Sequence, residues 1–174
     1  MVEESEDRDG TGINIRLAIA TDAPALAELR YTFRSSAGAV SEGESEFVGR
    51  CRHWMEKRLR EDGPWRCWVA ERGHELVGNL WAQLVEKIPN PVGEPERHAY
   101  VTNFYVRECE RGRGTGSLLL SAALDWCRES DVHAVILWPT ERSRSLYLRH
   151  GFAVREDLLE LIVWEIRDST RGEK

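Results

Sequence analysis

The residues best suited to chemistry form one short loop, Arg111-Gly112-Arg113-Gly114-Thr115-Gly116. It follows an apolar run from Tyr100 to Val106, which predicts a strand, and it opens a segment from Ser117 with an apolar face, which predicts a helix. Glycines let backbone N–H groups approach a ligand closely, and the first turn of a helix leaves such groups without partners. The two arginines add positive charge. The loop is therefore predicted to bind an anion, most naturally a diphosphate.

The spacing of the loop narrows the kind of diphosphate. A Walker A loop needs a Lys-Ser/Thr pair after its last glycine, whereas this chain has Ser117-Leu118 there. A dinucleotide fingerprint needs G-x-G-x-x-G, but Gly112, Gly114 and Gly116 run G-x-G-x-G, without a long parallel βαβ repeat around them. ATP and NAD are therefore disfavoured. Taken alone, the loop would favour an ordinary glycine-rich β-to-α turn over a ligand site.

A second motif follows downstream, Ser145-Leu146-Tyr147-Leu148-Arg149-His150-Gly151-Phe152. The first loop, read as R-x-x-G-x-G from Arg111, resembles the pyrophosphate loop of the GCN5-related N-acetyltransferases (GNAT). The second motif resembles the L-Y-x-x-x-G-F signature of the same family. The order of the two motifs and the strand expected between them, His133 to Leu137, also match. The resemblance extends over nearly the whole chain, from near Ile15 to near Ile166.

This resemblance implies an α/β GNAT fold, in which a mixed, largely antiparallel sheet has helices on both faces and one splayed parallel strand pair. The hydrophobic pattern predicts the matching elements. We expect a single domain over residues 13–168, with a tail at 1–12 that composition predicts to be disordered and a second tail at 169–174. The N-terminal part is expected to form a strand with Ile13, Ile15, Leu17 and Ile19 on one buried face, a helix from Thr21-Asp22, and a second helix around Phe47 to Leu59. A hairpin of Trp65–Glu71 and Glu75–Val85 should follow, and then the central strand and the helix after the loop. The C-terminal part is expected to contain a strand at Val132–Trp138, a helix at Glu141–His150, and two last strands at Phe152–Val154 and Leu158–Ile166.

The resemblance also implies acetyl-CoA as the acyl donor. Its pantetheine arm would lie in the cleft between the central strand and the strand at Val132–Trp138. There it would pair with the backbone of Phe104, Tyr105 and Val106. Where many family members carry Asn and a small residue at the start of the last helix, this chain has Thr140 and Ser143. The residues expected to bind the donor are these three strand residues, the loop residues Arg111, Gly112, Arg113, Gly114, Thr115 and Gly116, and Ser117, Thr140 and Ser143.

The family's chemistry is direct attack of a neutral amine on the thioester within a ternary complex. Such a reaction needs an acid for the departing thiolate and a base for the amine. Tyr147 occupies the tyrosine of the family motif and is predicted to be the general acid, with a core aromatic role as the alternative.

The base is less defined by the sequence. Candidates are His98, Glu96 and Glu86, while Asn103 is a candidate for orienting the acceptor or a water molecule. Strand alternation places His98, Tyr100, Thr102 and Phe104 on one face, and Ala99, Val101, Asn103 and Tyr105 on the other.

Composition agrees with one globular domain, since the 174 residues are 41% hydrophobic and contain no apolar run of the roughly 18 residues that span a membrane. The N-terminus lacks the pattern of a signal peptide, so a cytoplasmic location is expected. Four scattered cysteines indicate neither a metal site nor a disulfide framework. The net charge of -6, without a basic stripe, disfavours nucleic acid as a partner.

We therefore expect an N-acetyltransferase that acts on a primary amine of a small molecule, without a membrane partner. A homodimer is one assembly compatible with this expectation. A protein N-terminal or lysine acetyltransferase is one alternative. A non-catalytic acyl-CoA-binding sensor or interaction protein is the other.

Overall fold

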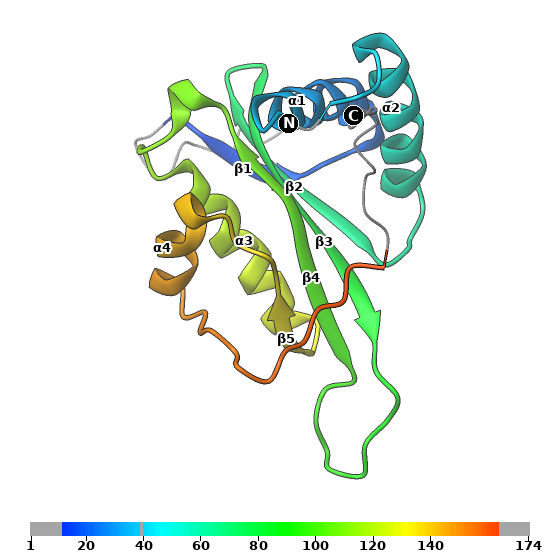
Figure 1. Cartoon of the computed structure of the whole chain (residues 1–174), viewed down its shortest axis with the longest axis vertical. Helices are drawn as coiled ribbons and strands as arrows, with labels where there is room; N and C mark the ends of the chain where they lie inside the picture. Colours follow the sequence, from blue (N-terminus) through cyan, green and yellow to red (C-terminus); the bar gives the residue numbers. More distant parts are fainter. Residues whose placement is uncertain (1–11, 39, 164–174) are drawn as a thin grey trace, which may run out of the picture.

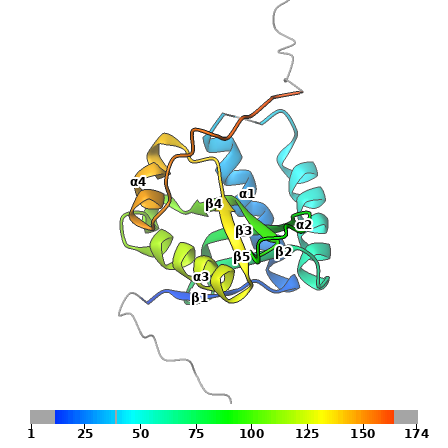
Figure 2. The same ribbon diagram turned by 90° about the horizontal axis from the view of Figure 1, so that it is seen from below.

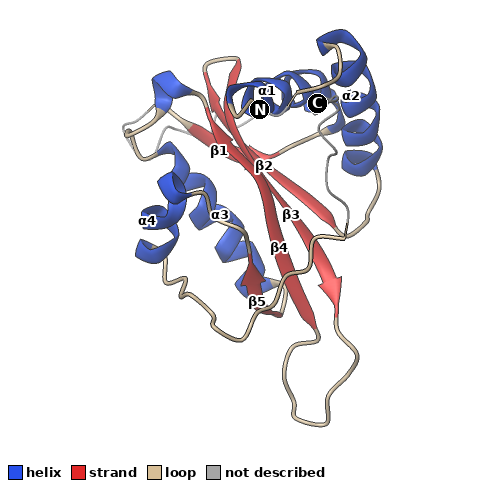
Figure 3. Ribbon diagram, viewed as in Figure 1, coloured by secondary structure: helices blue, strands red, loops and turns tan. Residues whose placement is uncertain are grey.

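The computed structural model describes residues 12–38 and 40–163 of the chain. Its strands form one five-stranded sheet in the order β1-β2-β3-β4-β5, with helices packed around it (Figures 1 and 3). The elements in chain order are β1 (Asn14–Leu17), η1 (Ala20–Asp22), α1 (Ala23–Ser36), α2 (Glu44–Arg60), β2 (Trp65–Arg72), β3 (Glu75–Glu86), β4 (Arg97–Val106), η2 (Glu108–Glu110), α3 (Thr115–Glu129), β5 (Val132–Ile136) and α4 (Glu141–Arg149), where η denotes a 3-10 helix.

The sheet is mixed, as the sequence predicted. β1 through β4 pair antiparallel, and β4 and β5 pair in parallel. A parallel connection needs a crossover, which here is η2 followed by α3. The predicted hairpin is present as β2 and β3, joined at Gly73, whose φ of 61° suits a tight turn.

Helices cover both faces of the sheet, which confirms the predicted layers (Figure 2). α3 and α4 lie on one face, where Leu119, Leu120 and Tyr147 join a cluster with Trp68 and Leu80 of the sheet. α1 and α2 lie on the other face, over a second cluster. Each face of the central strands is therefore buried, and the ends of β4 and β5 lie between the two helical layers. Within the described part, none of the helices has the length and apolar character needed to cross a bilayer.

Two predictions about strands were wrong. Residues 152–163 contain no strand, although the sequence predicted strands at Phe152–Val154 and Leu158–Ile166, whose last residues lie outside the described part. Alternation shows which side chains share a face, but a strand also needs a neighbouring strand to pair with. Residues 158–163 pair with none in the described part, and all six side chains are exposed. Ile13, just before β1, is buried, but Leu17 at the end of β1 is about half exposed, because β1 is a short edge strand.

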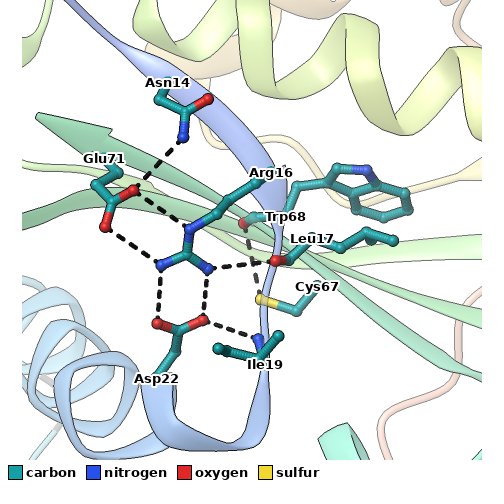
Figure 4. Close-up of polar contacts among 8 residues, drawn as sticks. All are labelled: Asn14, Arg16, Leu17, Ile19, Asp22, Cys67, Trp68 and Glu71. Atoms are coloured by element: carbon teal, nitrogen blue, oxygen red, sulfur yellow. Dashed lines mark hydrogen bonds and ion pairs between the residues drawn. The ribbon is translucent and has the colours of Figure 1, made fainter. Parts of the chain in front are cut away.

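The start of α1 is fixed to the sheet by the guanidinium group of Arg16 (Figure 4). It donates to both carboxylate oxygens of Asp22, at 2.7 and 3.0 Å, and to Glu71 of β2 at 3.3 Å. Asp22 also accepts the N–H of Ile19 at 2.8 Å. Asp22 is the N-cap residue of α1, but its side chain accepts no bond from the first turn of α1 and binds Arg16 instead. One arginine thus joins β1, β2 and the entry to α1.

The Asp22→Asn variant is expected to unfold more easily at neutral pH, by about 1.5–3 kcal/mol, because hydrogen bonds to a charged group are lost. Burial alone would raise the pKa of Asp22, but the hydrogen bonds from Arg16 and Ile19 outweigh it, so the pKa lies below its usual 3.8. The carboxylate therefore stabilises the fold above pH 3.8 and loses this effect only as the pH falls through the lower folded value.

Urea unfolding from about pH 7 to pH 3 measures this difference. The gap between wild type and Asp22→Asn should hold down to about pH 4 and then shrink. The matched control is Asp62→Asn, because Asp62 also pairs with an arginine but its side chain is 98% exposed. No measurable change is expected there. A gap that already closes well above pH 4 would contradict a lowered pKa of Asp22.

Gly78 of β3 marks the closest contact between the sheet and α3. A Cβ atom at this position would lie 3.0 Å from the carbonyl oxygen of Tyr105 and 3.2 Å from Leu119. Gly78→Ala should therefore destabilise the protein by about 1–3 kcal/mol in urea unfolding. Gly49→Ala is the matched control, because Gly49 lies within α2 and a Cβ there meets nothing within 4 Å. That variant should gain about 0.5–1 kcal/mol, and equal effects at the two sites would rule out the packing argument.

Candidate active site

The candidate site lies where β4 and β5 separate. Their ladder pairs Arg97 to Tyr100 with Val132 to Ile136, and β4 then continues to Val106 without a partner on that side among the described residues. The side chains of Tyr100 and Trp138 meet edge to face at the end of the ladder, with ring centroids 5.1 Å apart. The predicted splay of the parallel pair is therefore present. It leaves the β4 backbone from residue 101 onward open to an extended ligand.

A bulge in β4 lies beside this opening. The β3–β4 register shifts between Asn79 and Trp81, and Asn103 adopts a left-handed backbone with φ 47°. Two side chains hold it there: the amide of Asn79 donates to the Asn103 carbonyl at 2.7 Å, and Arg30 donates to the Asn103 side-chain oxygen at 3.2 Å. A non-glycine residue at positive φ is strained, so the surrounding contacts fix this geometry.

The bulge corrects the predicted faces of β4. Strict alternation placed Val101 with Tyr105, and Phe104 on the opposite face. In the structure Val101 and Phe104 both pack in the cluster that contains α3, whereas Tyr105 packs against Phe33 of α1 with ring centroids 5.4 Å apart. One extra residue in the strand reverses the alternation after Asn103.

The glycine loop has the geometry of an anion site. Gly112 and Gly114 have φ values of 74° and 89°, and a Cβ atom at either would meet nothing within 4 Å. Gly114 is the N-cap of α3, and its carbonyl accepts from Leu118. The amides of residues 112–117 donate no hydrogen bond within the described part of the chain. The hydroxyl of Thr115 is buried and also lacks a protein partner there. These free donors surround open space at a helix N-terminus.

The two loop arginines differ in their surroundings. Arg111 turns back onto the protein: it donates to the Val106 carbonyl at 2.9 Å, pairs with Glu108 at 2.7 Å, and lies over the Tyr105 ring at 5.6 Å. Its contacts therefore fix the loop against the end of β4. Arg113 is exposed and makes no ion pair within the described residues. Of the two predicted phosphate partners, Arg113 has its guanidinium free for a ligand.

Tyr147 lies behind the loop, on α4. Its ring packs edge to face against Phe104 of β4 and Phe152, and its side chain is 7% exposed. Burial raises the pKa of Tyr147 above its usual 10.0, against a smaller opposing effect of a hydrogen bond with Ser143. The phenol therefore keeps its proton at neutral pH, as a general acid must. Burial in a core cluster is also what the core aromatic alternative predicts, so the acid role stays a prediction.

Thr140 and Ser143 form the N-terminal cap of α4. The Ser143 amide donates to the Thr140 hydroxyl at 3.3 Å, and the Thr140 amide donates to the Ser143 hydroxyl at 3.0 Å. This reciprocal pair is a capping box, in which Thr140 caps the helix. Their contact with a donor stays a prediction.

The base candidates lie apart from the bulge and the loop. Glu86 ends β3 opposite Arg97, Glu96 precedes β4, and His98 packs on His133 with ring centroids 5.6 Å apart. Burial, Lys87 and His133 lower the pKa of His98, so it is neutral and able to accept a proton at neutral pH. At about 3.3 Å per residue, however, His98 lies roughly 16 Å along β4 from Asn103. A role for any of the three would therefore need connecting water molecules, and the base stays a prediction.

Sequence reasoning missed one contact of the loop. The hydroxyl of Ser117 lies 3.2 Å from Nε2 of His150, and Nδ1 of the same ring lies 2.9 Å from the Leu146 carbonyl. A carbonyl only accepts, so Nδ1 carries the proton and Nε2 accepts from Ser117. His150 thereby links the first turn of α3 to the end of α4. The residue was visible within the second motif, but its neighbour Ser117 is distant in sequence.

Comparison with known families identifies the fold. Residues 27–152 match the Acetyltransferase (GNAT) family. The chain belongs to the GNAT family. A comparison with curated proteins gave no match. The matched range includes most of α1, all of α2, the β4 bulge, the glycine loop and the motif around Tyr147, so every part of the candidate site lies within it.

Solved structures show the same GNAT fold. A predicted acetyltransferase from Clostridium acetobutylicum, solved with acetyl-CoA, has a TM-score of 0.72 and 21% identity, over 86% of this chain and 96% of its own. An aminoglycoside acetyltransferase from an uncultured soil metagenomic sample has a TM-score of 0.68 and 17% identity, over 88% and 99%. Glucosamine-6-phosphate N-acetyltransferase from Arabidopsis thaliana has a TM-score of 0.65 and 17% identity, over 87% and 99%.

Acetyl-CoA is the donor typical of GNAT proteins, and the loop of this chain fits its pyrophosphate. The fit rests on three observations: the unpaired amides of residues 112–117, the open space above Gly112 and Gly114, and the orphaned hydroxyl of Thr115. The open edge of β4 fits the amides of a pantetheine arm, because from residue 101 onward it pairs with no strand on that side among the described residues; of its carbonyls, that of Val106 accepts from Arg111.

Proposed function

We propose that this GNAT protein transfers an acetyl group from acetyl-CoA to a primary amine of a small molecule, by direct attack within a ternary complex. The observation that carries the proposal is the glycine loop at the N-terminus of α3, together with the open edge of β4, where the ring of Tyr147 packs on Phe104. Together these features provide a place for a diphosphate, a place for an extended amide chain, and a proton donor.

The chain's own residues would bind and orient the donor. Amides of the loop and of the first turn of α3 would donate to the pyrophosphate, with Arg113 adding charge. Arg111 would hold the loop in place through Val106 and Glu108. Backbone groups of Phe104, Tyr105 and Val106 would pair with the pantetheine arm.

The reaction needs two proton movements. The amine nitrogen forms a bond to the thioester carbonyl carbon, and the C–S bond then breaks. Tyr147 would give its phenolic proton to the departing sulfur, and the amine proton would pass to water or to a base such as His98, Glu96 or Glu86. Asn103, fixed at the bulge, would orient the amine.

A small-molecule acceptor is favoured by the fold and by similar proteins. The sequence does not concentrate its lysines and arginines into one long basic stripe that would favour a macromolecular acceptor. Two proteins that share this fold carry names that specify small amine substrates, an aminoglycoside in one and glucosamine 6-phosphate in the other.

The proposal is tested by measuring thiol release from acetyl-CoA in the presence of a broad panel of small amines. We expect release that depends on one class of amine, together with an acetylated product seen by mass spectrometry. Peptides with a free N-terminus or a lysine form the comparison set. Acetyl-CoA binding without amine-dependent release from either set would overturn the proposal and favour the sensor alternative. Release with peptides alone would instead place the acceptor among proteins.

A further inference from the structure

Arg30 of α1 extends a positive charge toward the β4 bulge. Its Nη1 donates to the side-chain oxygen of Asn103 at 3.2 Å, and its guanidinium carbon lies 5.8 Å from the centre of the Phe33 ring. The side chain is partly buried. Its Nε and Nη2 groups donate to no protein acceptor within the described residues. The edge of the Arg30 guanidinium formed by Nε and Nη2 is therefore available to hydrogen-bond a ligand beside Asn103.

The charge of Arg30 is not compensated by the protein. No carboxylate of the described residues forms an ion pair with it, whereas Arg16, Arg50 and Arg72 each pair with an acid. Burial lowers the pKa of Arg30, and the charge of Arg34, one turn further along α1, lowers it again, while Cys51 and Tyr100 act in the opposite direction. A guanidinium stays charged at neutral pH in spite of such effects. The protein therefore keeps a partly buried cation beside a second cation.

Helix electrostatics do not explain this arrangement. Arg34 lies in the last turn of α1, where the helix dipole favours a cation. Arg30 lies a turn earlier and bends inward to the sheet. A partly desolvated charge costs free energy unless a partner compensates it, and the amide oxygen of Asn103 supplies one hydrogen bond. To hold the bulge alone, a neutral hydrogen-bond donor would be enough, because the uncharged amide of Asn79 already donates to the Asn103 carbonyl.

Arg30 lies on the acceptor side of the candidate site. The glycine loop and Tyr147 lie on the α3 and α4 side of β4, whereas Arg30 approaches from α1 on the opposite face. Tyr100 packs on Trp138 where β4 and β5 separate. An amine that reaches a thioester at the bulge from the α1 side would therefore pass beside Arg30.

We infer that Arg30 and Asn103 form an anion subsite, so that the amine acceptor carries a carboxylate or a phosphate group. This inference rests on the proposed acetyl transfer and specifies its substrate class. Guanidinium groups bind both anions with paired hydrogen bonds, and the free Nε and Nη2 edge has the geometry for this. A polycationic acceptor such as an aminoglycoside would meet repulsion from Arg30 and Arg34 at the same place.

Matched pairs of amines test this subsite. The pairs are phosphoethanolamine with ethanolamine, glucosamine 6-phosphate with glucosamine, and glutamate with its diamide, so that only the anionic group differs within a pair. Turnover is measured as thiol release, and binding is measured by calorimetry in the presence of coenzyme A. For at least one pair the wild-type protein should prefer the anionic member by about ten-fold or more, through KM or Kd.

Arg30→Gln should remove this preference, so that the anionic member of a pair is used no better than the neutral one. Arg30→Lys keeps the charge without the planar fork, so part of the preference should remain. Arg52→Gln is the control, because Arg52 is exposed on α2 and makes no ion pair within the described residues. Thermal unfolding of each variant separates a local effect from a loss of fold.

The outcomes separate the two proposals. If the anionic member binds in an Arg30-dependent way but no thiol is released, the subsite stands and acetyl transfer fails. If amines are acetylated without preference for the anionic member, or with a preference that Arg30→Gln leaves unchanged, transfer stands and the subsite is overturned. The absence of any anionic preference in both binding and turnover also overturns it.

Discussion

Gly114→Val is expected to abolish the stabilisation of the protein by acetyl-CoA. A ligand that binds only the native state at about 100 times its Kd stabilises by about 2.7 kcal/mol, which corresponds to a Tm increase of roughly 5–11 °C for a chain of this size. Gly114 adopts φ 89° at the N-cap of α3, next to the free amides of the loop. Valine cannot adopt this conformation without strain, and its branched side chain would fill the open space above the loop.

The measurement is a thermal unfolding curve with and without acetyl-CoA. Gly93→Val is the matched control, because Gly93 also has a positive φ of 51° and lies in the loop between β3 and β4, at the opposite end of the sheet. Both variants should lose some intrinsic stability from backbone strain, but only Gly114→Val should lose the shift caused by acetyl-CoA. A full shift in Gly114→Val would show that the diphosphate binds elsewhere.

The elements that depend on local patterns were predicted from the sequence. The helix after the loop, the hairpin of β2 and β3, and the cap at Thr140 follow from hydrophobic period, turn residues and capping residues. The parallel pair of β4 and β5 followed from the family resemblance. The family match at residues 27–152 confirms that the two motifs were sufficient to recognise the fold.

What the sequence could not predict depends on contacts between distant residues. The β4 bulge arises because Asn79 and Arg30 hold Asn103 at a positive φ, and alternation within β4 contains no sign of these partners. For the same reason the contacts of Arg111 with Val106 and Glu108 could not be predicted from the motif, and its binding to a phosphate stays a prediction. The absence of a strand at residues 158–163 also depends on pairing that a hydrophobic pattern does not specify.

The second large effect is expected for Tyr147→Phe. Turnover should fall by about 100-fold if proton donation to the sulfur limits the rate. The variant removes the phenolic hydroxyl and keeps the ring, which packs against Phe104 and Phe152. Because burial raises the pKa of Tyr147, the wild-type group stays protonated at neutral pH and carries the proton that the thiolate needs. Affinity for acetyl-CoA should change little, since the loop and the β4 edge are untouched.

The same variant distinguishes the acid from the core aromatic alternative. A core role predicts lost stability with little loss of turnover per folded molecule, whereas the acid role predicts near-native thermal stability and depressed kcat. Tyr31→Phe, on α1 and packed against Phe47, controls for the removal of a phenolic hydroxyl away from the loop. Coenzyme A thiolate is itself a tolerable leaving group, so the rate should also be compared over pH. An equally stable and fully active Tyr147→Phe enzyme, tested on an amine that it acetylates, would mean that water protonates the sulfur and that the tyrosine serves the core alone.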